Sequence, residues 1–277
     1  MNYFELQSEC ALALERAGIE NFRNESRWLI EETLQIPAAV QYSDRPLPEA
    51  DISRIRELCA RRCQHEPLQY ILGTAPFAEL ELKVDPNVLI PRSETVVLVE
   101  YVLEKLPEHG SLLDVGCGSG AIALLAASRR PDIAVYALDK SPGALAAAQV
   151  NARELDLAEK VKFFESDLLE QLPPLKFDCI AANLPYVTFD EYAGLADDVR
   201  LFEPEMALTA PENGMALISR LIVSAPEFMS KGAILALEMS PPQTLQAVRA
   251  LEARGFADAE VFADQFGKKR FAAARWQ

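Results

Sequence analysis

Apolar positions recur every three or four residues through the first quarter of the chain, which is the spacing of one face of an α-helix. Residues 2–65 carry three such stripes, the third over about 49–64. Gly18 follows the first stripe and Pro37 the second, and both residue types are common just past the end of a helix. The stripes consist of Phe4, Leu6, Ala11, Leu12 and Leu14, of Trp28, Leu29, Ile30 and Leu34, and of Ile52, Ile55, Leu58 and Cys59. This pattern predicts a small bundle of three helices.

The helical spacing gives way to shorter alternation after residue 73. Phe77, Leu80, Leu82 and Val84 are apolar positions among polar neighbours, which predicts a β-hairpin joining the bundle to the rest of the chain. A helix is expected next, over about 94–106, with Ser93 as its N-cap.

From residue 111 onward, short apolar runs alternate with helical patterns. Strands are expected near 111–116, 133–139, 161–165, 177–182, 232–239, 257–263 and 269–276, and helices near 119–130, 141–156, 212–229 and 241–255. Repeated strand–helix units predict a mostly parallel sheet covered on both faces. The turn between the last two strands, around residues 264–267, is short, so these strands should form an antiparallel hairpin at one edge. We therefore expect an α/β fold with a helical bundle over 1–73, a hairpin linker over 74–92 and a Rossmann-like domain over 93–277.

Composition narrows the class of protein without changing this picture. Half of the 277 residues are apolar, enough for the core of one large or two modest domains. No stretch has the length and apolar character of a membrane span or a secretory signal, and the five cysteines are scattered, so a cytoplasmic protein is expected. Cys59, Cys63 and His65 have a spacing compatible with zinc, but no second ligand pair accompanies them and we expect no metal. The net charge of −15 opposes direct binding of nucleic acid and favours basic protein partners.

Three alternating glycines end the first strand of the expected sheet. They are Gly116, Gly118 and Gly120, and we call residues 116–120 the glycine loop. Glycines suit a place where a ligand lies against the backbone, because a side chain would collide with it. About twenty residues further on, a second strand ends in Asp139, and an acid there can hold the two hydroxyls of a ribose.

The spacing G-x-G-x-G differs from the G-x-G-x-x-G of dinucleotide sites, and no Gly-Lys-Ser/Thr sequence for a triphosphate is present. A nucleoside without phosphates is the better ligand, and S-adenosylmethionine, with S-adenosylhomocysteine as its product, fits that description. Asp167 follows the third strand, where it can accept the amine of adenine or cap a helix, or do both. The residues expected to contact the cofactor are Asp114, Gly116, Cys117, Gly118, Gly120, Asp139, Lys140, Asp167, Leu168 and Asn183.

The sequence Asn-Leu-Pro-Tyr at residues 183–186, the strand-end motif, follows another apolar strand. An amide or adenine NH2 group is a poor nucleophile because its lone pair is delocalised. The Asn183 side-chain carbonyl and the Leu184 backbone carbonyl can accept its two N–H bonds and direct the lone pair toward a methyl group. Pro185 is expected to hold the turn and Tyr186 to pack against the planar group. The motif predicts methyl transfer to nitrogen, although a purely structural turn is an alternative. The C-terminal hairpin likewise favours the methyltransferase variant of the fold over the dehydrogenase variant.

Taken together, these motifs resemble the HemK-type family of release factor glutamine methyltransferases. The likeness covers nearly the whole chain and includes residues 67–73 (Pro-Leu-Gln-Tyr-Ile-Leu-Gly) with Phe77, 90–92 (Ile-Pro-Arg), Glu203-Pro204 with Ala207-Leu208, and Leu237-Glu238. The resemblance implies methylation of the glutamine side-chain amide in the Gly-Gly-Gln motif of peptide chain release factors. It also implies substrate contacts from Arg92 and Glu94. The N-terminal bundle carries none of the strand-end polar groups, so we expect it to recognise the release factor, and we expect a monomer that binds no nucleic acid, membrane or metal.

Two positions depart from the family pattern. Leu184 stands where the family usually has proline, and the resulting Asn-Leu-Pro-Tyr also occurs in adenine-N6 methyltransferases of ribosomal RNA. Val96 stands where glutamate is usual, so Glu94 would have to compensate if that glutamate contacts the substrate. The alternatives are an adenine-N6 methyltransferase acting on RNA or DNA, a ribosomal-protein glutamine methyltransferase, and a non-catalytic binding module. The acidic charge and the helical N-terminal domain favour the release factor enzyme.

Overall fold

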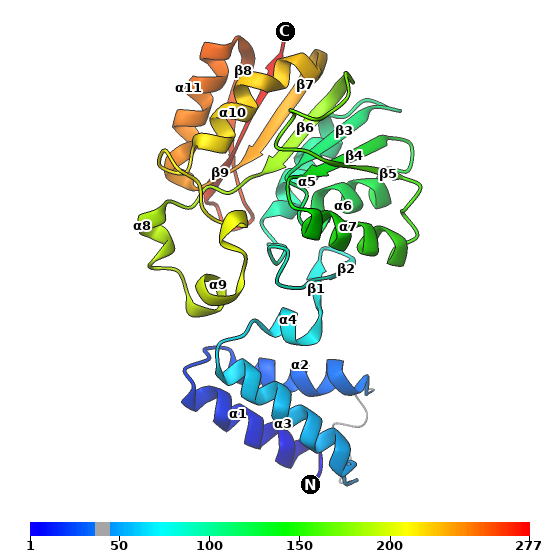
Figure 1. Ribbon diagram of the computed structural model, residues 1–277, viewed down its shortest axis with the longest axis vertical. Coiled ribbons are helices and arrows are strands. Elements are labelled where there is room, and N and C mark those ends of the chain that lie inside the picture. Colours follow the sequence, from blue (N-terminus) through cyan, green and yellow to red (C-terminus); the bar gives the residue numbers. More distant parts are fainter. Residues whose placement is uncertain (37–44) are drawn as a thin grey trace. The chain divides into compact units, whose positions relative to one another are not determined.

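The computed structural model describes residues 1–36 and 45–277, which form two compact units (Figure 1). One unit comprises Met1–Thr74 together with Ala196–Phe202, and the other comprises Ala75–Leu195 and Glu203–Gln277. Pro37, expected to follow the second helix, lies outside the described residues. No helix in the described part of the chain combines the length and the apolar character that crossing a membrane requires.

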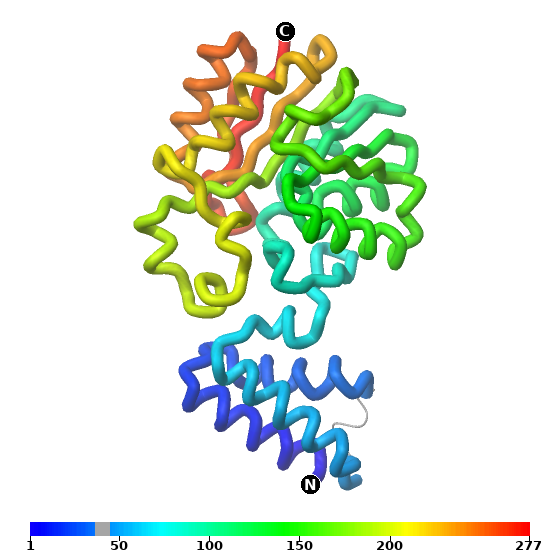
Figure 2. Tube along the Cα trace, in the orientation of Figure 1, coloured from blue at the N-terminus to red at the C-terminus, as the bar shows by residue number. Residues whose placement is uncertain are grey.

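Helices make up most of the first unit. They are α1 (Tyr3–Arg16), α2 (Phe22–Leu34), α3 (Glu49–Cys63), α4 (Leu68–Leu72) and α9 (Asp197–Phe202). Asn2 caps α1 through its side chain, and the Glu5 carboxylate accepts the Asn2 backbone N–H in return, which completes a capping box. Helices α1, α2 and α3 pack together into a small bundle, whose path Figure 2 traces. Leu6, Leu14 and Leu29 are fully buried in its core. The apolar stripes therefore identified these three helices correctly.

The second unit is built on a seven-stranded sheet with the order β5-β4-β3-β6-β7-β9-β8. Its strands are β3 (Ser111–Val115), β4 (Ala134–Asp139), β5 (Val161–Glu165), β6 (Phe177–Asn183), β7 (Met229–Glu238), β8 (Phe256–Ala263) and β9 (Lys269–Trp276). Strands β3 to β7 pair in parallel, while β9 is antiparallel to both β7 and β8. A separate two-stranded hairpin, β1 (Thr74–Phe77) and β2 (Leu80–Lys83), precedes them. The expected α/β architecture with its antiparallel C-terminal hairpin is confirmed.

Helices cover both faces of the sheet (Figure 1). On one face lie α5 (Thr95–Lys105), α6 (Ala121–Arg129) and α7 (Pro142–Glu154), and on the other α10 (Ala216–Ser224) and α11 (Thr244–Arg254). Successive strand residues alternate between the two cores, as with Leu112 on the first face and Leu113 on the second. Both cores consist mostly of aliphatic side chains with almost no exposure, joined by a few buried phenylalanines, and this packing holds the carboxyl ends of the parallel strands in fixed positions.

Some local expectations were wrong. Ser93 does not cap α5, because the helix begins at Thr95 after a helical Glu94, and the Ser93 hydroxyl donates to the Glu94 carboxylate instead. The helix expected over 212–229 extends only over α10, since Glu212 and Asn213 have left-handed backbones that exclude a helix start. No α-helix follows Asp167, so it cannot act as a helix cap there.

Candidate active site

A pocket lies within the second unit, at the carboxyl ends of β3, β4 and β6, where open parallel sheets bind their ligands. Eleven of the residues predicted for the site line it: Arg92, Gly116, Cys117, Gly118, Asp139, Lys140, Asp167, Leu168, Asn183, Leu184 and Pro185. Four others, Asp114, Gly120, Tyr186 and Glu94, do not form its wall. The fold thus places residues that are distant in the sequence around a single cavity.

Hydrogen bonds to the neighbouring strand β4 hold the backbone of the glycine loop. The Gly116 and Cys117 N–H groups both donate to the Leu138 carbonyl, at 2.8 and 2.9 Å. Both Gly116 and Gly118 have positive φ values, of 75° and 56°, which disfavour any other residue. Around Gly118 an added Cβ would meet nothing within 4 Å, so the loop backbone borders open space in the pocket.

Asp114 and Gly120 lie beneath this loop rather than in the pocket. Asp114 is fully buried, and its carboxylate accepts the Ala123 N–H in the first turn of α6 at 3.1 Å. Burial raises the pKa of Asp114 to about 8, while that hydrogen bond acts in the opposite direction. Gly120 has a φ of 86°, and an added Cβ would lie 2.9 Å from Leu124 Cδ1. Both residues fix the strand–loop–helix connection.

Asp139 links the glycine loop to the end of β4. Its Oδ2 accepts the Gly118 N–H and its Oδ1 accepts the Ser141 N–H, each at 2.9 Å. Burial raises the pKa of Asp139, whereas the backbone hydrogen bonds from Ser141 and Gly118 lower it. Each carboxylate oxygen keeps a further lone pair for a ligand hydroxyl.

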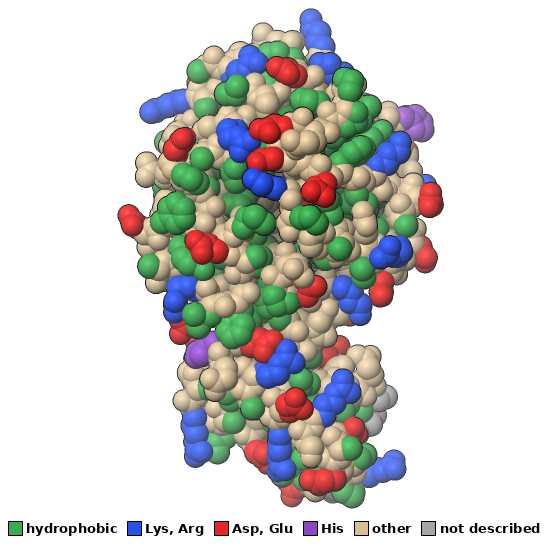
Figure 3. Space-filling model, viewed as in Figure 1, with side chains coloured by type: hydrophobic (Ala, Val, Ile, Leu, Met, Phe, Trp, Pro, Cys, Tyr) green, Lys and Arg blue, Asp and Glu red, His purple; other side chains and the backbone are tan. Residues whose placement is uncertain are grey.

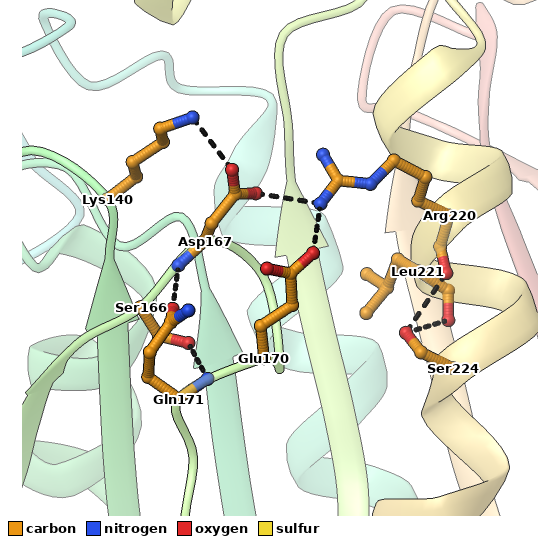
Figure 4. A network of polar contacts seen from close by, with 8 residues as sticks. All are labelled: Lys140, Ser166, Asp167, Glu170, Gln171, Arg220, Leu221 and Ser224. Carbon is orange, nitrogen blue, oxygen red and sulfur yellow. Dashed lines mark hydrogen bonds and ion pairs between the residues drawn. The ribbon is translucent and has the colours of Figure 1, made fainter.

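Asp167 lies at the centre of a charged network beside the pocket (Figure 4). Lys140 Nζ donates to Oδ2 at 2.7 Å, and Arg220 Nη2 donates to Oδ1 at 3.0 Å and to Glu170 at 2.8 Å. The Lys140 hydrogen bond is the main reason why the pKa of Asp167 is lowered. The Gln171 side chain accepts the Asp167 N–H, which fixes the backbone at the same point. Asp167 is therefore a fixed carboxylate acceptor.

The strand-end motif lies at the end of β6 with Asn183 facing the pocket. Leu184 is 5% exposed, and its Cδ2 would be 2.9 Å from a Cβ added at Gly116, so the motif packs against the glycine loop. The Tyr186 carbonyl accepts a hydrogen bond from Gln243 Nε2 at 2.8 Å, which anchors the far end of the motif. Burial raises the pKa of the Tyr186 phenol to about 12, so it is neutral at ordinary pH.

A chain of hydrogen bonds runs from Asn183 into the interior. Asn183 Nδ2 donates to Thr95 Oγ1 at 3.1 Å, and Thr95 Oγ1 donates to Glu238 Oε2 at 2.7 Å. Thr95 and Glu238 are 4% and 1% exposed. The Asn183 side chain is therefore held by a specific partner rather than free to rotate.

Arg92 reaches the pocket from the loop before α5. Its guanidinium donates to Glu203 Oε1 at 2.6 Å, and Glu203 Oε2 accepts the Ile90 N–H at 3.1 Å. Glu203 is 4% exposed, so this carboxylate is buried beneath the Ile-Pro-Arg segment and holds it in place. Val96 packs against the hydrophobic core, and Glu94 lies 3.9 Å from Arg270.

Sequence reasoning assigned no site role to Thr95, Glu203 or Glu238. Glu203 and Glu238 belong to segments that carry the family resemblance, and that was the only sequence signal for them. Their contacts in this structure join residues more than a hundred positions apart, which no local pattern reveals.

Comparison with known proteins agrees with this arrangement. The family described as PrmC N-terminal domain matches residues 5–73, and the methyltransferase small domain family matches residues 93–197. A release factor glutamine methyltransferase from Geobacter sulfurreducens is 36% identical over 264 residues, covering 95% of this chain and 92% of the relative. One from Moorella thermoacetica is 38% identical over 268 residues, covering 95% and 94%.

The fold also matches a solved methyltransferase from Pyrococcus furiosus. The TM-score is 0.55 at 15% identity, over 80% of this chain and 95% of that one, which supports the fold alone. The sequence relatives extend across both units at well above that identity. This chain belongs to the release factor glutamine methyltransferase family.

Proposed function

We propose that this protein transfers a methyl group from S-adenosylmethionine to the side-chain amide nitrogen of the glutamine in the Gly-Gly-Gln motif of peptide chain release factors. The proposal depends most on one observation: Asn183 opens into the same cavity as the glycine loop. A methyl donor and an acceptor amide can react only where their two sites share one space. The relatives from G. sulfurreducens and M. thermoacetica, matched over almost their full lengths, carry the corresponding name.

The shape and the lining residues of the cavity suit S-adenosylmethionine. The open space at Gly118 admits a ligand against the backbone, where any Cβ would intrude. Asp139 would accept the ribose hydroxyls and Asp167 the adenine amine, with Cys117, Lys140 and Leu168 completing the walls. When bound, the cofactor supplies a methyl group on a positively charged sulfur, which is a good leaving group.

The residues of the strand-end motif would orient the acceptor amide. Asn183 Oδ1 and the Leu184 carbonyl accept its two N–H bonds and leave the nitrogen lone pair directed at the methyl group. Orientation of this kind can lower a barrier by about 7–11 kcal/mol. Pro185 restricts the turn, and the neutral Tyr186 ring packs beside the planar amide. No strong base is needed, because the nitrogen becomes acidic once it is methylated and can lose its proton to water.

Substrate recognition would extend beyond the motif. Arg92, held by Glu203, presents a fixed cation at the pocket wall. Val96 packs against the core, so Glu94 would have to supply the contact if the glutamate usual in the family binds the substrate. The helical first unit, which lies outside the pocket-bearing unit, would bind the body of the release factor, and the acidic surface disfavours competing nucleic acid.

The test is methyl transfer from labelled S-adenosylmethionine to three separate purified substrates: a release factor, ribosomal proteins and ribosomal RNA. We expect label in the release factor, on its Gly-Gly-Gln glutamine, and none in the other two. A release factor whose glutamine is replaced by asparagine should remain unlabelled. Label in adenine of the RNA, or in ribosomal protein alone, would contradict the proposal.

A further inference from the structure

The end of β7 carries a buried carboxyl group that the mechanism above does not use. Glu238 is the last residue of β7, and it is paired in the sheet with Asn183, the last residue of β6. The Thr95 hydroxyl from α5 hydrogen-bonds to both side chains and so links Glu238 to Asn183. Three elements of the fold therefore meet at one hydrogen-bonded chain.

The hydrogen bonds in this chain have a fixed direction. A threonine hydroxyl has one proton, and an ionised carboxylate can only accept. Thr95 therefore donates its proton to Glu238 and can only accept from Asn183. Asn183 must turn its NH2 group toward Thr95, which leaves the carbonyl oxygen at the other end of the amide for the substrate.

We infer that Glu238 is a positioning residue for methyl transfer, which in its ionised form orients the Asn183 carbonyl toward the substrate amide through Thr95. This inference rests on the proposed function. A protonated Glu238 can donate to Thr95, and the Thr95 proton then turns toward Asn183. The Asn183 amide would have to present its oxygen to Thr95 and its NH2 group to the substrate, whose own N–H bonds need an acceptor.

The surroundings of Glu238 bring its protonation into the pH range of ordinary assays. Burial raises the pKa of Glu238 to about 7. The Thr95 hydrogen bond and the positive charges of Arg270 on β9 and Arg92 before α5 favour the ionised form, while Glu94 opposes it. Tyr186, the titratable group next to the motif, stays neutral. The contribution of Glu238 to turnover is therefore present above its pKa and is lost as the pH falls below it.

The experiment measures single-turnover methyl transfer to a purified release factor on both sides of pH 7, with S-adenosylmethionine saturating. In the wild type, the rate should fall by about tenfold per pH unit below the inflection and reach a plateau above it. Glu238→Gln keeps the shape and can still accept the Thr95 proton, but it does not titrate. Its rate should lose the inflection near pH 7 while its cofactor affinity and melting temperature stay close to those of the wild type.

Variants of Thr95 test whether its hydroxyl couples Glu238 to Asn183. Thr95→Val removes the hydroxyl at nearly constant volume and should lower kcat by about tenfold or more, with little change in KM for the release factor. Thr95→Ser keeps the hydroxyl and should restore both the rate and the pH inflection. Tyr101→Phe, on the same helix, removes a hydroxyl that bonds Glu260 instead and should leave the profile unchanged.

These outcomes separate the inference from the proposed function. A wild type that methylates no release factor at any pH contradicts the proposed function. An active wild type whose pH inflection persists in Glu238→Gln overturns only the role of Glu238 and assigns the titration elsewhere, for example to Asp114, whose pKa is about 8. Wild-type kcat in Thr95→Val would equally overturn it.

Discussion

At the scale of single residues, Gly116 and Gly118 lie two positions apart with left-handed backbones but face different surroundings. A Cβ at Gly116 would come within 2.9 Å of Leu184, a residue of the protein itself. A Cβ at Gly118 would meet no protein atom within 4 Å, and Gly118 lines the pocket that we assign to the cofactor. We therefore expect Gly116 to serve internal packing and Gly118 to serve ligand access.

Gly118→Ala should weaken cofactor binding by at least tenfold, because a methyl group would occupy the ligand space. The matched control is Gly73→Ala in the first unit. Gly73 also has a positive φ, of 76°, and also has nothing within 4 Å of an added Cβ. Both variants should lose about 1–2 kcal/mol of stability from backbone strain. Calorimetric titration with S-adenosylhomocysteine checks the difference, and equal affinities for the two variants would contradict the assignment of Gly118.

The residues of the pocket differ in how far sequence could predict them. Asn183, Asp139 and the glycine loop end apolar strands, and the carboxyl ends of parallel strands share one edge, so local pattern was sufficient. Thr95 and Glu238 are 143 positions apart, and only the folded chain places their side chains in contact. Asp114 stands at a strand end like the others, but its side chain turns inward and accepts the Ala123 N–H of α6.

At the scale of elements, periodicity located every long helix and every strand of the sheet, because each has one or two faces buried in a hydrophobic core. It failed at the ends of helices, because the first helical residue depends on the backbone conformation or side-chain hydrogen bond of one or two residues. Residues 212–214 have left-handed backbones, so α10 begins only after them. The Ser93 hydroxyl, expected to cap α5, donates instead to the Glu94 carboxylate. The first feature has a sequence signal, because Asn213-Gly214 is a dipeptide typical of turns, whereas the second depends on one hydrogen bond that no pattern reveals.

The helices of the first unit are joined by a buried cation. Arg62 on α3 is 6% exposed, donates to Glu25 on α2 at 2.6 Å, and lies 3.8 Å from Asp198 on α9. Arg62→Ala leaves Glu25 without its partner and should destabilise this unit by about 3–5 kcal/mol. The neighbouring Arg61→Ala is a control, since its ion pair with Glu66 lies at the surface and is worth under about 1 kcal/mol. Denaturant unfolding distinguishes the two, and equal midpoints would contradict the structural role of Arg62.

At the scale of the whole molecule, the net charge of −15 is not gathered into one patch on the face displayed in Figure 3, where acidic, basic and hydrophobic side chains are interspersed. The cofactor pocket lies entirely in the second unit, which has its own two cores. The first unit has a separate core, and none of its described residues lines that pocket. This division supports separate roles for catalysis and for recognition of the protein substrate.

Deleting residues 1–73 should therefore separate two activities. Affinity for S-adenosylhomocysteine should change by less than about threefold, while methylation of a whole release factor should fall by about tenfold or more, because the contacts that we propose for the bundle are lost. A short peptide containing Gly-Gly-Gln makes no such contacts, so its slow methylation should be nearly unchanged. Equal methylation of the whole factor by a folded truncated chain would contradict a recognition role for the bundle.

The most direct test of the central claim compares catalysis with cofactor binding in variants of Asn183. Asn183→Ala removes an acceptor from the substrate amide but touches neither Asp139 nor Gly118. Asn183→Asp keeps an acceptor of the same size, but its negative charge could tighten cofactor binding in the ground state while stabilising the charge-neutralising transition state less.

The measurement is the single-turnover rate of methyl transfer to a purified release factor, alongside equilibrium binding of S-adenosylhomocysteine. For Asn183→Ala we predict a rate lower by about a hundredfold or more, because losing one well-placed polar contact in such a site costs roughly 2.7–4 kcal/mol. Cofactor affinity should stay near that of the wild type, and Asn183→Asp should lose turnover without losing affinity. A wild-type rate in Asn183→Ala would show that the strand-end motif is only a turn and would contradict the mechanism.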